Sequence, residues 1–308
     1  SMEELICEDL NKTISIKGFN FEIGFNKCNG TIEKWNYDGI NMLNKGPSLN
    51  FWRAPIDNDM YVVKEWKEKF IHLLQSRLDG LEFRIINKSL IEVKTKVYIS
   101  PPTLNWGIDC QFSYKIYGSG DVFIDLEGHP KGDLPDSLPR IGFKMEIPKE
   151  FENITWYGRG PGESYSDSKL ANKFGIYKKT VDGLHTPYVK PQENGNRTDV
   201  KWVSALNSNG IGFFISGMPY IDFSAHNYTE QDLENALHTF KLININRDSI
   251  FLNIDYKQNG LGSNSCGPRP LPQYKLSPED FKMGIRIKPF SLNEMSEIAL
   301  SKQIIHHM

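Results

Sequence analysis

Residues 110 to 126, with the sequence CQFSYKIYGSGDVFIDL, alternate apolar and polar side chains on both sides of a glycine-containing turn. The apolar positions at two-residue spacing are Cys110, Phe112, Tyr114, Ile116, Val122, Ile124 and Leu126. This period is the mark of a half-buried β-strand. The intervening Gly118-Ser119-Gly120-Asp121 is typical of a tight turn, so the stretch predicts a β-hairpin.

The same alternation recurs along most of the chain. Further strands are expected at residues 91–99, 141–147, 211–215, 251–255 and 282–287. Asn29-Gly30 and Asn209-Gly210 are good hairpin turns, and residues 100–103 predict a turn between strands. Strands and helices do not alternate as they would in a (β/α)8 barrel. The sequence therefore predicts an all-β protein, a large antiparallel β-sandwich, as one domain over residues 1–308 with a core from about 7 to 288.

Helical signals are few. Trp66, Phe70, Leu73 and Leu74 lie at helical spacing and predict an amphipathic helix that ends near Asp79-Gly80. Thr229 followed by Asp232 resembles a capping box, which predicts a short helix through Leu233, Ala236 and Leu237.

Composition excludes several classes of function. A net charge of -2 gives no electrostatic footprint for nucleic acid. No stretch approaches the ~20 apolar residues that cross a bilayer, and no signal peptide opens the chain, so we expect no membrane partner and a cytoplasmic protein. The four cysteines are far apart, which argues against disulfides and zinc. The pair His306-His307 indicates a polar tail rather than a metal site.

Four polar segments interrupt the strand pattern. The first is residues 53–59, where Asp57, Asn58 and Asp59 follow Arg53. These side chains suit a metal or sugar site, but a loop fixed by hydrogen bonds between Asp and the backbone and between Arg and carboxylate is favoured. The spacing does not fit an EF-hand loop.

The other three segments are residues 156–167, 188–197 and 260–268. The first of these places aromatic residues, glycines, Glu163 and Asp167 in one loop, whereas Glu193 and Arg197 suit either a ligand contact or a surface turn with an internal salt bridge. Cys266 has no flanking sequence that indicates a catalytic partner. Glycosidases need two carboxylic acids at a defined separation, and none of the loop carboxylates has a catalytic signature. The residues alone thus indicate a β-sandwich with polar, aromatic loops suited to carbohydrate.

The four segments, in this order, resemble the fifth, carboxy-terminal domain of the large family 2 β-galactosidases, which some lactic-acid bacteria encode as a separate small subunit. The residues that carry the resemblance are Arg53 to Asp59, Trp156 to Pro161 with Glu163-Ser164-Tyr165 and Asp167, Thr186 to Val189 with Glu193-Asn194-Gly195, and Leu252 to Asp255 with the Gly-Leu-Gly that follows. The resemblance covers nearly the whole chain, from about Cys7 to Lys288.

The resemblance implies a supersandwich fold like that of galactose mutarotases and a non-catalytic role in hydrolysing terminal β-galactosides such as lactose. The catalytic glutamates of such an enzyme sit on a barrel-bearing polypeptide outside this chain, which would be its partner. The whole enzyme would use Mg²⁺ and Na⁺, with no cofactor or metal held by this chain.

The resemblance also assigns roles to site residues. The family lends a loop to the edge of the active site, where an aromatic residue after serine contacts the sugar. Cys266, after Ser265, stands at that position, and Arg269 is a possible substitute. A thiol lacks the broad apolar face of an indole. Positioning or interface roles fall to Arg53, Asp57, Asn58, Asp59, Glu163, Asp167 and Glu193.

Two alternatives stay open. A free-standing carbohydrate-binding module fits the aromatic loops. An aldose mutarotase would need a general acid and base, commonly Glu and His. His129, His185 and His226 are present, but none lies in a motif that resembles the mutarotase set. Sequence leaves the oligomeric state, the preferred aglycone and the choice between subunit and domain undecided.

Overall fold

A computed structural model describes residues 2–243, 245 and 247–305, so His306 and His307 lie outside the described residues. Five antiparallel strands form the smaller of two sheets, in the order β1-β2-β3-β4-β5. They are β1 (Ile6–Asp9), β2 (Thr13–Lys17), β3 (Phe21–Asn26), β4 (Ile32–Tyr37) and β5 (Ile40–Asn41).

The larger sheet has twelve strands within the described part of the chain, along the path β13-β12-β14-β15-β17-β10-β9-β8-β7. Three further strands extend the sheet beside this path. The carboxy-terminal half of β15 pairs with β16, β16 pairs with β11, and β11 pairs with β6. The strands are β6 (Lys45–Asn50), β7 (Gln75–Asn87), β8 (Leu90–Ser100), β9 (Trp106–Tyr117), β10 (Val122–Gly132), β11 (Arg140–Pro148), β12 (Asn153–Gly160), β13 (Lys173–Thr180), β14 (Arg197–Leu206), β15 (Ile211–His226), β16 (Ser249–Gln258) and β17 (Phe281–Ser291). The prediction of an all-β, antiparallel fold is confirmed.

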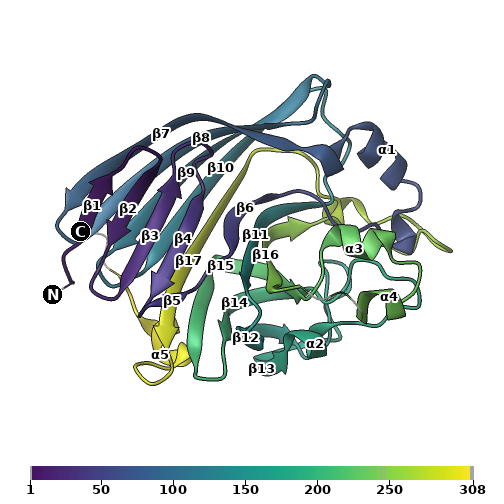
Figure 1. Ribbon diagram of the computed structural model, residues 1–308. Coiled ribbons are helices and arrows are strands. Elements are labelled where there is room, and N and C mark those ends of the chain that lie inside the picture. The colour runs from purple at the N-terminus through teal and green to yellow at the C-terminus, as the bar shows by residue number, and fades with distance from the viewer. Residues whose placement is uncertain (1, 244, 246, 306–308) are drawn as a thin grey trace.

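The helices are short and lie outside the sheets. They are α1 (Val63–Glu68), α2 (Val181–Leu184), α3 (Glu230–Asn235), α4 (Phe240–Ile243) and α5 (Glu297–Lys302), with 3-10 turns η1 (Asp57–Asp59), η2 (Ile71–Leu73) and η3 (Pro272–Tyr274). In Figure 1, α1 to α4 gather at the end of the sandwich opposite the smaller sheet and the N-terminus. Among the described residues, no helix has the length and apolar content that crossing a membrane requires.

Buried apolar side chains join the two sheets into one core. Phe25 of β3 packs edge-on against Tyr114 of β9, with ring centroids 5.1 Å apart. Trp35 of β4 meets Phe213 of β15 at 5.0 Å in the same geometry. Edge-to-face aromatic pairs add stabilisation beyond the area they bury. The curled larger sheet therefore packs on the smaller sheet through these aromatic contacts (Figure 1).

The predicted hairpin of residues 110–126 is confirmed as the junction of β9 and β10. Ile116 pairs with Val122, and the register continues to Trp106 opposite Gly132. At the turn the Gly120 N–H donates to the Tyr117 carbonyl at 2.9 Å. Gly120 has a φ of 82°, a conformation that glycine adopts without steric cost.

The predicted helix around Trp66 is confirmed only as far as Glu68. Trp66 is fully buried on α1, but Phe70 adopts a φ of 54°, in the left-handed region, which ends helical propagation. The chain then makes the turn η2 and enters β7. Asp79-Gly80 lies inside this strand at a register shift against β8, so the expected helix stop there was wrong.

The predicted capping box at Thr229 is confirmed. The Asp232 N–H donates to the Thr229 hydroxyl at 3.1 Å, and the Thr229 N–H donates to the Asp232 carboxylate at 2.9 Å. Helix α3 ends at Asn235, before Leu237, whose side chain is exposed. The start of this helix was therefore predicted better than its end.

Candidate functional site

Arg53 anchors the first polar segment from inside the protein. Its guanidinium is fully buried and donates to both carboxylate oxygens of Asp59, at 2.8 and 3.1 Å. It also donates to the Asn259 carbonyl at 2.7 Å and lies 5.6 Å from the ring centre of Trp66. The second oxygen of Asp59 accepts the N–H of Ile56, which closes the 3-10 turn. Arg53 and Asp59 therefore fix this loop against the strand end at Asn259.

Asn58 points outward from the same turn and holds a second loop, residues 260–268. Its amide nitrogen donates to the Gly262 carbonyl at 2.7 Å. Its amide oxygen accepts the backbone N–H of Ser265 at 3.2 Å and the Ser265 hydroxyl at 2.7 Å. We call residues 260–268 the tethered loop.

Asp167, from another of the polar segments, holds the tethered loop as well. Its two carboxylate oxygens accept the N–H groups of Leu261 at 3.0 Å and Gly262 at 2.8 Å. Hydrogen bonds from backbone N–H groups to an ionised carboxylate are stronger than neutral ones. Two residues distant in sequence, Asn58 and Asp167, thus position the same loop.

Cys266 and Arg269 are exposed at and just beyond the tip of this loop. The Cys266 N–H donates to the Ser263 carbonyl at 3.0 Å, and its thiol is free. Arg269 lines a cavity of about 280 Å³ together with Asn58 and Asp59. The expected sugar-contact residues are therefore solvent-accessible and lie beside the first polar segment.

Asp57 joins the first segment to residues 188–197. The Asp57 N–H donates to the side-chain oxygen of Gln192 at 3.1 Å, and the Gln192 amide donates back to the Asp57 carboxylate at 3.2 Å. Glu163, in the segment 156–167, is also bonded to residues 188–197. Its carboxylate accepts the Tyr188 hydroxyl and the Gly195 N–H, the latter at 2.8 Å. All four polar segments are thereby connected.

Glu193 lies under this network rather than on its surface. It is 4% exposed, and Tyr165 donates to it at 3.4 Å. Arg197, also buried, donates to the Gly195 carbonyl at 2.7 Å. The interpretation of this segment as a surface turn with an internal salt bridge between Glu193 and Arg197 was wrong, because Glu193 instead faces Arg140 at 3.8 Å.

Arg140, which sequence reasoning missed, is the centre of a buried charge cluster. Its guanidinium donates to Asp255 at 2.8 Å and lies 3.8 Å from both Glu193 and Glu230. Burial alone would lower the pKa of Arg140, but the three carboxylates outweigh it and raise that pKa. Burial raises the pKa of Glu193 to about 7 and that of Asp255 to about 6, against the opposing effect of Arg140.

The Glu193→Gln variant is expected to gain stability relative to the wild type as the pH rises. The folded chain holds the Glu193 proton up to about pH 7, whereas the unfolded carboxyl releases it near 4.5. The stability that the folded protein gains from the protonated Glu193 carboxyl is therefore fully present below about pH 4.5 and is lost as the pH rises through 7. The difference in free energy of unfolding should move toward the variant by about 1 kcal/mol or more between pH 5 and 8.

Urea unfolding at both pH values measures this difference. Glu150→Gln, at an exposed position, is the matched control, and its difference from the wild type should not move in this way. Parallel pH profiles for Glu193→Gln and the wild type would contradict the assignment.

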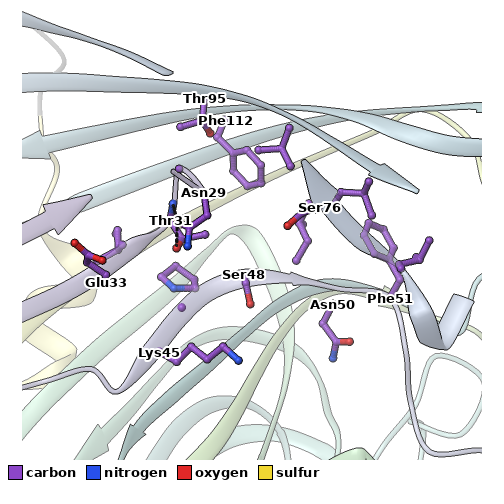
Figure 2. A pocket seen from close by; sticks show the side chains of 18 of the residues that line it. Asn29, Thr31, Glu33, Lys45, Ser48, Asn50, Phe51, Ser76, Thr95 and Phe112 are labelled. Carbon is purple, nitrogen blue, oxygen red and sulfur yellow. Dashed lines mark hydrogen bonds between the residues drawn. The ribbon is translucent and has the colours of Figure 1, made fainter. Parts of the chain in front are cut away.

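Larger cavities lie away from these loops. One of about 490 Å³ is lined by residues of both sheets. Figure 2 shows Thr95 and Phe112, from β8 and β9, on one side of it, and Ser48 and Asn50, from β6, on the other. A second, of about 540 Å³, is bounded by β15, β16 and the segment 272–281. Within the described ranges, no group of three or more His, Cys, Asp or Glu side chains is arranged to hold a metal ion.

Known proteins match this chain over most of its length. Residues 17–287 match the family model for the beta galactosidase small chain. The chain belongs to this family. One relative that is similar to this chain is a beta-galactosidase of Priestia megaterium. It is 32% identical over 276 residues, which cover 88% of this chain and 26% of that protein. A beta-galactosidase of Kluyveromyces lactis is 30% identical over 279 residues, covering 89% and 27%. This member thus spans about a quarter of the length of the curated relatives it matches.

Solved structures similar to this small-chain family member include two proteins of the aldose epimerase kind. One is a galactose 1-epimerase of Lactobacillus acidophilus, with 13% identity and a TM-score of 0.46 over 94% of this chain and 99% of that one. The other is an aldose epimerase homologue of C. elegans, with 8% identity and a TM-score of 0.47 over 94% and 99%.

Proposed function

We propose that this chain is a non-catalytic part, either carboxy-terminal domain or small subunit, of a β-galactosidase that hydrolyses terminal β-galactosides such as lactose. The observation that carries the proposal is the extent of the family match. It runs over residues 17–287 of this chain, yet the matched region is only about a quarter of each relative. The remaining three quarters would supply the catalytic barrel on which this chain packs.

The tethered loop is the part that we place at the edge of the active site. Asn58 and Asp167 fix it from two sides, and Cys266 and Arg269 are exposed on it or beside it. Positioned loops on a rigid scaffold are where binding residues concentrate. Arg53, Asp57, Asp59 and Glu163 would act through this loop and its neighbours, as positioning residues.

Exposed apolar side chains around the tethered loop support a partner on this face. Met60 and Tyr61 follow Asp59 directly, and Leu271 lies three residues after the loop; all three are more than half exposed. Tyr61 lines the same cavity as Arg269. Apolar side chains gathered next to a fixed polar loop are typical of a protein interface.

The catalytic carboxylates are proposed to come from the partner. A retaining glycosidase places two carboxyl groups about 5 Å apart on either side of the scissile bond. Glu193 has a raised pKa, but it is buried against Arg140 and Tyr165 and lines none of the cavities described above. We place the Mg²⁺ and Na⁺ expected for the whole enzyme on the partner as well, and route no step through them.

The mutarotase alternative has no observation in its favour. His129 is exposed and faces Asp280 at 3.1 Å. His185 shares a hydrogen bond with Tyr228, and His226 is buried against the same ring, where burial lowers its pKa to about 3. These histidines are held by other protein groups rather than directed at one open site.

Mixing experiments test the proposal. The chain alone should not cleave nitrophenyl galactoside or accelerate glucose mutarotation, and the barrel-bearing polypeptide alone should be inactive or weak. Together they should hydrolyse the substrate. Cleavage by the chain alone would refute the proposal. Tight sugar binding without complementation would instead establish a free-standing carbohydrate-binding module.

Replacing Cys266 by tryptophan tests the position of the loop. Because an indole offers a sugar ring a broad apolar face that a thiol lacks, Cys266→Trp should strengthen inhibition of the assembled enzyme by glucose as an acceptor. We expect the glucose inhibition constant to fall about threefold to tenfold, equivalent to roughly 0.6–1.4 kcal/mol. Cys28→Trp, at another exposed cysteine, is the control. An unchanged constant for Cys266→Trp would place the loop elsewhere.

A further inference from the structure

Strand β7 ends the larger sheet, and one of its two long sides has no neighbouring strand (Figure 1). Its register against β8 is regular from Gly80 to Ile85, between a shift at Leu78 and another at Asn87. Within the described part of the chain, no backbone hydrogen bond joins residues 81–85 to any segment other than β8. We call residues 81–85 the β7 edge segment. Every second N–H and C=O of this segment therefore lacks a strand partner.

The sequence of the β7 edge segment, Leu-Glu-Phe-Arg-Ile, is complementary to itself when two copies run antiparallel. If Phe83 lies opposite Phe83 of a second copy, then Leu81 lies opposite Ile85. In the same register Glu82 lies opposite Arg84. Each of these unlike pairs forms twice, because a two-fold axis relates the copies. Apolar pairs and pairs of opposite charge both stabilise neighbouring strands, whereas like charges directly opposite one another destabilise them.

Charges on β8 extend this complementarity into the sheet. Glu82 is paired in register with Lys94, and Arg84 with Glu92. In the symmetric arrangement, one row on this face holds Glu92 and Arg84 of one copy, followed by Glu82 and Lys94 of the other. Arg84 lies 3.6 Å from Glu82 of its own strand, but both side chains are more than half exposed and stay open to a second partner. Opposite charges would meet at every step of the row, including the step across the axis.

The other face of the β7 edge segment is apolar and incompletely covered. Leu81 and Phe83 are partly buried against the main core, and Ile85 is 63% exposed. This face therefore lacks the inward-pointing charge that protects many edge strands from pairing. A second copy would place its Leu81 against Ile85, where the chain alone leaves the side chain in water.

The strand at the opposite end of the path, β13, has a different composition. It also has a neighbour on one side only, which is β12. Its residues include Lys173, Lys178 and Lys179 and no acidic side chain, so two antiparallel copies would bring lysines together. Lysine is a common protection of edge strands. Self-complementarity therefore distinguishes β7 from β13.

We propose that two copies of this chain associate through the β7 edge segment, as antiparallel strands related by a two-fold axis. The larger sheet would then continue from one copy into the other. Five residues from each copy make a small contact, so the dimer is weak and reversible. The proposal goes beyond the proposed function, because it needs neither the barrel-bearing polypeptide nor the tethered loop.

Sedimentation velocity of the purified chain, from micromolar to near-millimolar concentration, tests this association. The wild type should show a reversible equilibrium between monomer and dimer. Arg84→Glu sets two pairs of glutamates opposite one another, and Glu82→Arg sets two pairs of arginines. Each variant should raise the dissociation constant of the dimer at least about tenfold. Lys178→Glu, a charge reversal at an exposed position on β13, is the matched control and should leave the constant unchanged.

Mixing the two variants separates lost complementarity from lost folding. In a mixed pair, one chain carries two arginines and the other two glutamates, so every pair across the axis has opposite charges. An equimolar mixture of Glu82→Arg and Arg84→Glu should therefore dimerise at concentrations at which each variant alone is a monomer. Thermal melts verify that both variants fold. A wild-type chain that stays monomeric throughout, a dissociation constant unchanged in both variants, or a mixture that stays monomeric would overturn the proposal.

Discussion

Replacing Arg140 by alanine is expected to lower the free energy of unfolding by about 3 to 5 kcal/mol, because it removes one partner of a buried ion cluster. The guanidinium is fully buried and faces Asp255, Glu193 and Glu230. Once it is gone, Asp255 and Glu193 lose their nearest compensating charge in the protein interior, whereas Glu230 keeps its ion pair with Lys144. Urea unfolding measures the loss.

The same variant should respond to pH in a characteristic way. At pH 5, Glu193 and Asp255 can hold protons, since burial has already raised their pKa values to about 7 and about 6. The cost of removing Arg140 should therefore be smaller at pH 5 than at pH 8. Arg77→Ala, which breaks an exposed pair with Asp79, is the control and should change the unfolding midpoint little. An Arg140→Ala variant that unfolds at the wild-type urea concentration would refute this account of the cluster.

Replacing Asp167 by alanine is expected to lower kcat/KM of the assembled β-galactosidase at least about tenfold, roughly 1.4 kcal/mol of transition-state stabilisation, while the chain still assembles. Asp167 supplies the carboxylate that accepts two N–H groups of the tethered loop. Without it, the loop keeps the bonds to Asn58 and the bond from the Gly260 N–H to the Tyr274 carbonyl, but Leu261 and Gly262 lose their acceptor, so Cys266 and Arg269 are held less firmly.

Hydrogen exchange separates this role from a loss of folding. In Asp167→Ala the amides of residues 260–267 should exchange faster, while those of β9 and β10 stay protected. Asp182→Ala, which removes an exposed carboxylate bonded to Asn227, is the matched control and should leave both loop exchange and kcat/KM unchanged. Faster loop exchange with an unchanged kcat/KM would show that the loop does not bear on the substrate.

The strands could be predicted from sequence because their signal is local. The alternation at residues 91–99 and 110–126 sets one face of β8, β9 and β10 toward the core, and the glycine turn fixes the register. The helix near Trp66 was overextended because Phe70 and Leu74 keep helical spacing although Phe70 takes a left-handed conformation. Tertiary packing, which no local pattern records, decides that point.

The positioning role of the polar loops was also accessible from sequence, whereas their partners were not. Arg53 and Asp59 are six residues apart and bond directly, as their spacing suggests. The link from Asn58 to Ser265 crosses 207 residues and exists only in the folded chain. Arg140 was missed because it stands at the start of an ordinary strand. One signal was available: Asp255 is a charged residue within an apolar strand, which indicates a buried partner.

We propose that this chain completes a β-galactosidase whose catalytic glutamates lie on another polypeptide. The most direct measurement titrates a fixed amount of the barrel-bearing polypeptide with this chain and follows cleavage of nitrophenyl galactoside. We expect no cleavage by the chain alone and a rise in activity that saturates at one chain per barrel. Cleavage by the chain alone, or a barrel polypeptide whose activity does not respond to added chain, would contradict it.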